Sequence, residues 1–150
     1  MDNYICYVKY DKEDAEVIEM LSNVFNYKKE QIGNLFDQKD FEITFENRIL
    51  DEISEFCTEL NVYIPNNEIT AIYPNKFLFG YQVSKYLNQQ VLVSVSFENN
   101  DPYQYILIEN DLFFIVDEVI DDNSDDKYGI TVQKNTKIKI SYNDAINFSS

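Results

Sequence analysis

The sequence contains no histidine at all. Without the one side chain whose charge changes near neutral pH, Ser–His and Cys–His nucleophile pairs are excluded, and so is the commonest metal ligand. The three glycines, Gly33, Gly80 and Gly129, lack the spacing of any glycine-rich phosphate loop. A single arginine, Arg48, argues against clamps for phosphate or carboxylate groups. We therefore predict no catalytic residue, no cofactor and no enzymatic activity.

Cysteines, tryptophan and long apolar runs are also scarce or missing. Cys6 and Cys57 are isolated from each other among apolar neighbours, which is typical of reduced, buried thiols. The longest purely apolar run, residues 112–116, is far too short to cross a bilayer, and the first residues carry no basic leader. These features predict a soluble, cytoplasmic protein. Because no tryptophan is present to stack on a sugar, the many carboxylates do not indicate a glycosidase.

What the sequence has in excess is negative charge. It carries 27 acidic against 12 basic side chains, a net charge of −15. The excess is uneven, because residues 101–126 hold nine acidic residues and no basic one. Such a chain repels nucleic acids and anionic membranes and attracts basic protein surfaces. The plainer interpretation is that the charge only keeps the protein soluble.

The apolar content is sufficient for one folded domain spanning residues 1–150. Apolar residues make up 45% of the chain, including 11 phenylalanines and 12 tyrosines. A chain of 150 residues buries about 68–70% of its unfolded surface, so neither a metal nor a disulfide is needed for stability. We expect a monomer.

Hydrophobic periodicity predicts an α+β fold. Alternation and turn signals predict strands at 4–10, 41–46, 68–73, 91–97, 103–109, 112–120, 130–134 and 136–142. Helical spacing predicts a helix capped by Asp11, a weaker helical turn over 28–36, a clear helix over 48–60 and another over 75–88. Asn110-Asp111 is a plausible tight turn between two of the strands. The expected architecture is an antiparallel β-meander of about five to six strands packed against two or three N-terminal helices.

Two acidic patches are the candidate partner-binding residues. The first is the acidic loop and its flanks, with three tyrosines as aromatic anchors: Asp117, Glu118, Asp121, Asp122, Asp125, Asp126, Tyr128, Tyr103 and Tyr105. The second is the outer side of the helix expected over 48–60: Asp51, Glu52, Glu55 and Glu59. The plainer explanation of the acidic helix face is that its charges are only solvated, as on most amphipathic surface helices. The acidic loop is harder to explain in this way, because its concentrated negative charges repel one another more than solubility alone requires.

The acidic loop that begins at Asp121 matches some, but not all, positions of a calcium-binding EF-hand loop. Counted from Asp121, Asn123 and Asp125 stand at the third and fifth positions of an EF-hand loop. The sixth position is Asp126, where glycine is needed, and the twelfth is Val132, where a bidentate glutamate is needed. The sequence therefore predicts no metal site.

Part of the chain resembles the immunity proteins of bacterial toxin systems, including antidotes of polymorphic toxins and of contact-dependent inhibition. The similar stretch runs from Phe77 to Tyr128, about a third of the chain. In it a helix with Lys85-Tyr86-Leu87 leads into Val91-Leu92-Val93, and Tyr105-Ile106-Leu107-Ile108 is followed by a turn, a strand and an Asp-rich tail. The resemblance implies a tight one-to-one complex with a cognate toxin, often a basic nuclease. It assigns no individual residue a role.

The leading hypothesis is therefore a non-catalytic immunity protein that binds and neutralises a basic toxin domain. One alternative is a phage-encoded acidic decoy that imitates DNA; another is a structural or regulatory interaction module inside the cell. A decoy needs carboxylates at phosphate-like spacing over an extended surface, whereas an antidote can use one local patch with aromatic anchors. A toxin gene directly upstream would favour the antidote, and a phage early operon the decoy.

Overall fold

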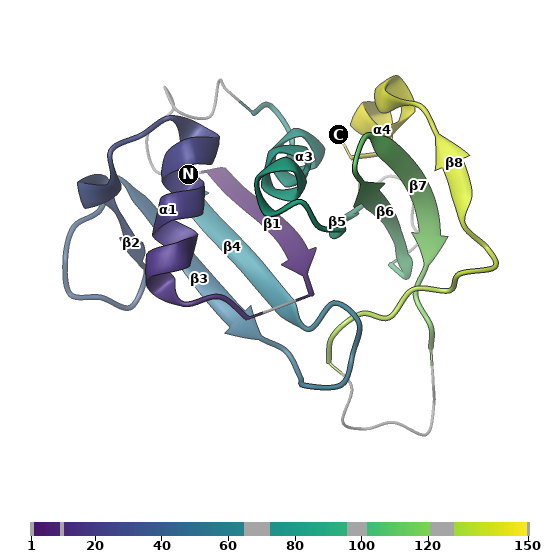
Figure 1. Ribbon diagram of the computed structural model, residues 1–150, viewed down its shortest axis with the longest axis horizontal. Coiled ribbons are helices and arrows are strands. Elements are labelled where there is room, and N and C mark those ends of the chain that lie inside the picture. The colour runs from purple at the N-terminus through teal and green to yellow at the C-terminus, as the bar shows by residue number, and fades with distance from the viewer. Residues whose placement is uncertain (1, 10, 65–72, 96–101, 121–127, 150) are drawn as a thin grey trace.

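The computed structural model describes residues 2–9, 11–64, 73–95, 102–120 and 128–149 (Figure 1). These residues form one mixed sheet with helices, so the predicted α+β class is confirmed. The strands are β1 (Asp2–Val8), β2 (Ile32–Asn34), β3 (Ile43–Ile49), β4 (Thr58–Ile64), β5 (Val91–Ser94), β6 (Gln104–Glu109), β7 (Leu112–Asp117) and β8 (Ile138–Ile140). The helices are α1 (Asp14–Phe25), the 3-10 turn η1 (Lys29–Gln31), α3 (Lys76–Leu87) and α4 (Tyr142–Ser149).

The eight strands lie in the order β2-β3-β4-β1-β5-β6-β7-β8. All neighbours are antiparallel except β2 and β3, which run parallel. The predicted meander is present as β5-β6-β7-β8, and its tight turn is confirmed, because Asn110 adopts a positive φ of 55° between β6 and β7. Strand β1 lies between β4 and β5 and joins the two halves of the sheet. Segments that are distant in sequence are therefore neighbours at the centre of the sheet.

The three α-helices lie on one face of the sheet (Figure 1). Alternate residues of the strands point towards them, as in Cys6, Leu60 and Val93, which are fully buried. From the helices, Leu21 and Phe79 are equally buried in the same cluster. Burial of apolar area on this face is the main source of stability.

The helix ends agree only partly with the capping signals. The N-cap of α1 is Glu13, whose side chain makes no capping hydrogen bond, so the prediction that Asp11 caps this helix is wrong. Asn75 caps α3, with its side-chain oxygen accepting from the Leu78 N–H at 3.0 Å. Asn88 ends α3 in the left-handed conformation that asparagine tolerates better than most residues.

The helix predicted over 48–60 is wrong. Arg48 and Ile49 complete β3, residues 50–57 form a loop, and Thr58 begins β4. Backbone pairing with β1 and β3 on both sides outweighs the helical spacing, because each β4 residue gains ladder hydrogen bonds that an isolated helix cannot supply.

Three further elements differ from the expectation, and a fourth is hardly covered by the described residues. The helical turn predicted over 28–36 is only η1, and the chain then extends into β2, whose Ile32 is buried beside β3. The strand predicted over 136–142 ends at Ile140, and α4 follows at the C-terminal end. The strand predicted over 130–134 is reduced to isolated bridges at Ile130 and Val132, and the one over 68–73 lies almost wholly outside the described residues.

Gly80 lets α3 pack closely on β5. A Cβ at this position would lie 2.6 Å from Cγ1 of Val93, a stiff β-branched side chain fixed in the sheet. Ala is the better helix former by about 1 kcal/mol, but overpacking of a core costs about 1–3 kcal/mol. We expect Gly80→Ala to lower the free energy of unfolding in urea, with Gln82→Ala on the same helix as control. A stabilised G80A variant would contradict this packing.

Candidate functional site

Two segments cover the centre of the sheet face that the helices leave open. They are the β3–β4 loop, residues 50–57, and residues 128–133. Phe56 and Ile130 form an antiparallel bridge, in which the Phe56 N–H donates to the Ile130 carbonyl at 2.8 Å and the reverse bond is 3.0 Å. The buried side chains beneath form a second apolar cluster: Phe56, Leu92, Leu107, Val116, Ile130 and Val132. Burial of this cluster fixes both segments to the sheet.

Asp51 joins the two segments directly. Its Oδ2 accepts hydrogen bonds from the N–H groups of Tyr128 (2.8 Å) and Gly129 (2.7 Å). Its Oδ1 accepts from the N–H groups of Ile53 (3.0 Å) and Ser54 (2.8 Å), and the Ser54 hydroxyl donates to Oδ2 at 2.7 Å. Burial alone would raise the pKa of Asp51, but these donors outweigh it and hold the pKa well below its usual range. Asp51 is therefore a carboxylate with a structural role, and its predicted contact with a partner stays a prediction.

Residues 128–133 lie between this loop and the end of β7. The Val119 N–H donates to the Thr131 carbonyl at 2.7 Å, and the Gln133 N–H donates to the Asp117 carbonyl at 2.8 Å. On the other side of β7, the Glu118 N–H donates to the Tyr103 carbonyl at 2.8 Å. The chain around Tyr103, the end of β7, residues 128–133 and the β3–β4 loop thus form one continuous layer.

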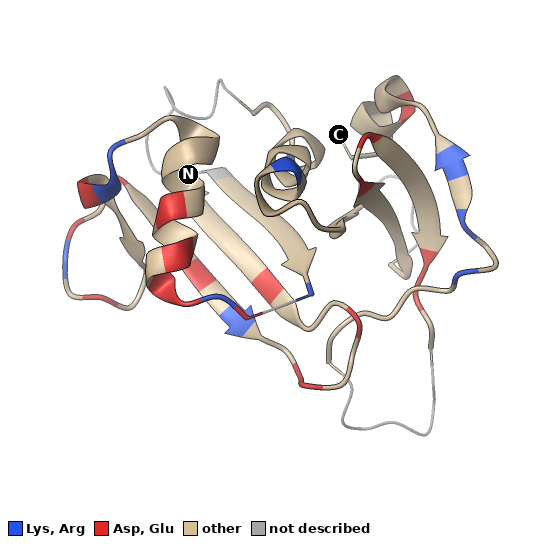
Figure 2. Cartoon of the chain, in the orientation of Figure 1, with Lys and Arg blue, Asp and Glu red and all other residues tan. Residues whose placement is uncertain are grey.

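This layer presents exposed apolar side chains among acidic ones. Tyr128 is 70% exposed, Ile53 61% and Ile120 57%, and Tyr103 and Val119 are also exposed. Figure 2 shows acidic residues on the β3–β4 loop and at the end of β7, along the lower edge of the molecule. We refer to this area as the acid-rimmed surface, made of Asp51, Glu52, Ile53, Tyr103, Asp117, Glu118, Val119, Ile120 and Tyr128.

Asp117 and Glu118 of the first patch and Asp51 and Glu52 of the second thus lie in one bonded layer, which the sequence did not indicate. Their members do not contribute equally. Glu52 is exposed, whereas Glu55 pairs with Lys9 at 3.4 Å and accepts from the Val132 N–H at 3.3 Å. Glu59 lies on β4 and accepts from the Asn61 amide at 2.6 Å. The second patch is therefore a loop and a strand, not a helix face, and three of its four carboxylates already have partners within the protein.

Among the predicted aromatic anchors, Tyr105 differs from Tyr103 and Tyr128. Its ring packs edge-on against Tyr7 at 5.9 Å, beside the second apolar cluster. Burial, with further contributions from Glu118 and Glu59, raises the pKa of Tyr105 to about 12. Burial likewise raises the pKa of the half-buried Glu118 carboxyl. Tyr105 is thus a supporting core residue, and the exposed rings are Tyr103 and Tyr128.

The four central aspartates of the first patch, Asp121, Asp122, Asp125 and Asp126, lie outside the described residues. The sequence pattern does not predict the exposed apolar residues Ile53, Val119 and Ile120. The strand predicted over 112–120 ends at Asp117, which leaves Val119 and Ile120 outside it, and Ile53 lies in a loop and not on the buried side of a helix. Two β-branched residues directly before an acidic run were the available signal.

The described part of the chain contains no group of three or more cysteine, aspartate or glutamate side chains placed to hold a metal ion. None of the helices in that part is long and apolar enough to cross a membrane. Comparison of the chain with protein-family models, with curated proteins and with solved structures found no match.

Proposed function

We propose that this chain is a non-catalytic binding protein that neutralises a basic protein, most specifically an immunity-type antidote to a toxin. The observation that carries the proposal is the acid-rimmed surface, where exposed Tyr128, Ile53 and Ile120 stand among carboxylates. Binding surfaces typically present large solvent-exposed apolar side chains, and here a hydrogen-bonded layer holds these side chains in place.

The two kinds of side chain serve different steps of binding. Acidic residues such as Glu52 and Asp117 attract a basic partner and speed its encounter. Aromatic and branched side chains such as Tyr128 then exclude water from the contact and slow dissociation. The pinning of Tyr128 and Ile53 by Asp51 lowers the entropic cost of binding, because the layer is ordered before the partner arrives.

A basic protein fits this surface better than the alternatives. Nucleic acid is repelled by a net charge of −15. A decoy that imitates DNA needs carboxylates in an uninterrupted array, whereas in the described part of this surface apolar residues separate them and Glu55 is paired with Lys9. This geometry therefore favours an antidote that uses one local contact surface over a decoy with an extended acidic surface.

Co-expression tests the proposal. A basic effector domain encoded beside this gene would be produced in a susceptible cell with or without the chain. We expect growth to be restored and a one-to-one complex to appear by light scattering. A variant carrying Tyr128→Ala and Ile53→Ser should fold but protect poorly. Equal protection by that variant, or by an unrelated protein of the same charge, would contradict the proposal.

A further inference from the structure

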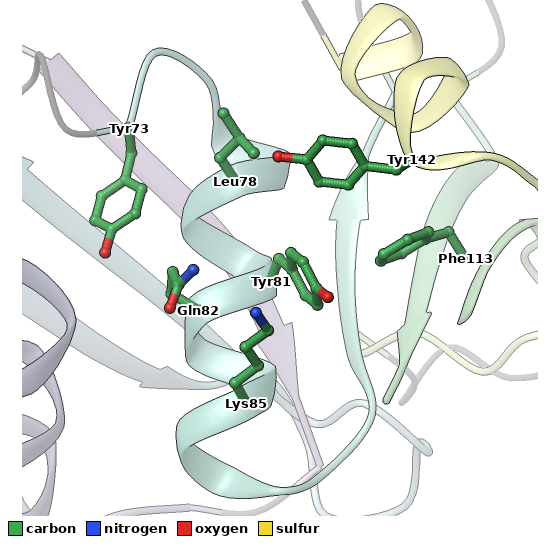
Figure 3. Close-up of a pocket in the computed structure, with 7 residues that line it drawn as sticks. All are labelled: Tyr73, Leu78, Tyr81, Gln82, Lys85, Phe113 and Tyr142. Carbon is green, nitrogen blue, oxygen red and sulfur yellow. The ribbon is translucent and has the colours of Figure 1, made fainter. Parts of the chain in front are cut away.

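A recess lies on the helical side of the sheet, opposite the acid-rimmed surface. It has a volume of about 520 Å³, within the range of small-molecule sites. Its floor is the outward stripe of α3, in which Leu78, Tyr81, Gln82 and Lys85 recur at helical spacing. Tyr73 forms one wall, and Phe113 of β7 with Tyr142 of α4 forms the other (Figure 3).

The walls of this recess are rigid before any ligand arrives. The Tyr81 hydroxyl donates to Asp111 Oδ1 at 2.6 Å, and the Tyr81 ring lies edge-on to Phe113 at 5.1 Å. On the other side, the Tyr73 hydroxyl donates to the Val24 carbonyl, and its ring packs on Phe25 at 5.4 Å. A preformed recess binds without first being ordered.

The polar groups of the recess define the ligand chemistry. The Lys85 ammonium is held 4.2 Å from the centre of the Tyr81 ring, and no ion pair joins it to a carboxylate among the described residues. The Gln82 amide, beside it on the helix, makes no hydrogen bond within the same residues and can donate two. No acidic side chain lines the recess, and the cation that faces the Tyr81 ring is already Lys85 of the chain itself.

We propose that this recess binds a small planar aromatic carboxylate. The aromatic body would lie against Leu78 between Tyr73 and Tyr142, and the carboxylate would accept hydrogen bonds from Lys85 and Gln82. A nucleotide is disfavoured because one ammonium cannot compensate several phosphate charges on so acidic a protein. This site is independent of the acid-rimmed surface, which lies on the other face of the sheet.

Indole-3-acetate is a suitable probe, because the chain has no tryptophan and all indole emission then comes from the ligand. Fluorescence anisotropy in about 0.15 M salt, which screens the net charge, should show saturable binding with Kd on the order of 1 mM. Amide NMR shifts should concentrate on residues 78–85 and around Tyr142.

Two variants distinguish the ionic contact of Lys85 with the carboxylate from non-specific binding of the ligand. Lys85→Gln should weaken indole-3-acetate binding about tenfold and leave the neutral indole-3-acetamide unchanged, as expected for loss of one charge-assisted contact. Lys139→Gln, at an exposed position on β8, is the matched control and should bind like the original protein. No saturation up to about 10 mM, ten times that Kd, would overturn the assignment. So would equal effects of K85Q on both ligands, or NMR shifts centred on residues 128–133.

Discussion

Replacing Asp51 with alanine should lower the free energy of unfolding by about 2–4 kcal/mol. Hydrogen bonds to a charged group contribute about 1.5–3 kcal/mol each, but Asp51 is only partly buried, so water replaces some of the lost bonds in the variant. The carboxylate accepts from four backbone N–H groups and one hydroxyl, and two of those donors, in Tyr128 and Gly129, belong to a distant segment. Without it, several N–H groups lose their partner together. Urea unfolding of the purified variants measures the difference.

The neighbouring Glu52 is the control for Asp51. It is exposed, so Glu52→Ala should leave stability unchanged. Asp51→Asn should fall between the two, because one amide oxygen still accepts while the NH₂ group faces donors. In D51A, amide hydrogen exchange should accelerate at Tyr128 and Gly129 but not in β1. An unchanged stability of D51A would show that the apolar cluster alone holds the layer.

The same carboxylate predicts a pH dependence. The folded-state pKa of Asp51 is depressed, so its stabilising contribution is present at neutral pH and is lost as the pH falls below about 4. Glu118 acts in the opposite sense, since its raised pKa favours the folded state when it is protonated. We therefore expect D51N to lose less stability than the original protein between about pH 4 and pH 2.

Local signals in the sequence were sufficient for part of the fold. The hairpin of β6 and β7 followed from two strand-like runs around Asn110-Asp111, and α3 corresponds to the helix predicted over 75–88. Both elements are fixed by residues near one another in the chain. Periodicity and turn chemistry are informative in such cases.

The region 48–60 shows why the rest could not be predicted. Ile49, Phe56 and Leu60 have helical spacing but separate in the structure: Ile49 is exposed, Phe56 joins the second apolar cluster and Leu60 the main core. Asp51, which was assigned to the solvated side of a helix, instead forms a turn with Ile53 and Ser54. Which face each residue enters depends on strands far away in sequence, and one sequence carries no record of that pairing.

The proximity of residues from the two acidic patches could not be predicted from the sequence either, although Gly129 indicated close packing near the acidic loop. A Cβ at Gly129 would lie 2.8 Å from the Phe56 carbonyl oxygen, so only glycine allows this approach. In a chain with three glycines, one beside an acidic loop indicates that another backbone passes close by. It could not indicate which backbone.

The largest effect on binding is expected from the aspartates of the acidic loop. Changing Asp121, Asp122, Asp125 and Asp126 to asparagine should slow association with a basic partner about tenfold or more at low salt, because steering depends on local charge. We expect stability to be unaffected, which is the usual result of neutralising solvated charges. Tyr128→Ala should instead act mainly on the dissociation rate.

The acids of the β3–β4 loop are not a suitable control, because Asp51 is structural and Glu55 is paired. A matched control changes four exposed acids at the β2 side of the molecule: Glu13, Glu30, Asp37 and Asp40. It removes the same charge without touching the acid-rimmed surface.

The central claim is that a basic protein binds at the acid-rimmed surface and is steered there by the acidic loop, which follows Ile120 of that surface directly in the sequence. The association rates of the loop variant and of the control variant test this claim most directly. The partner would be isolated from the source cells, and its binding followed by stopped flow from about 20 to 300 mM salt, where the screening length changes several-fold. We predict that the loop variant loses both rate and salt dependence while the control variant keeps most of both. Equal losses in the two variants, or a salt-independent rate for the original protein, would contradict the claim.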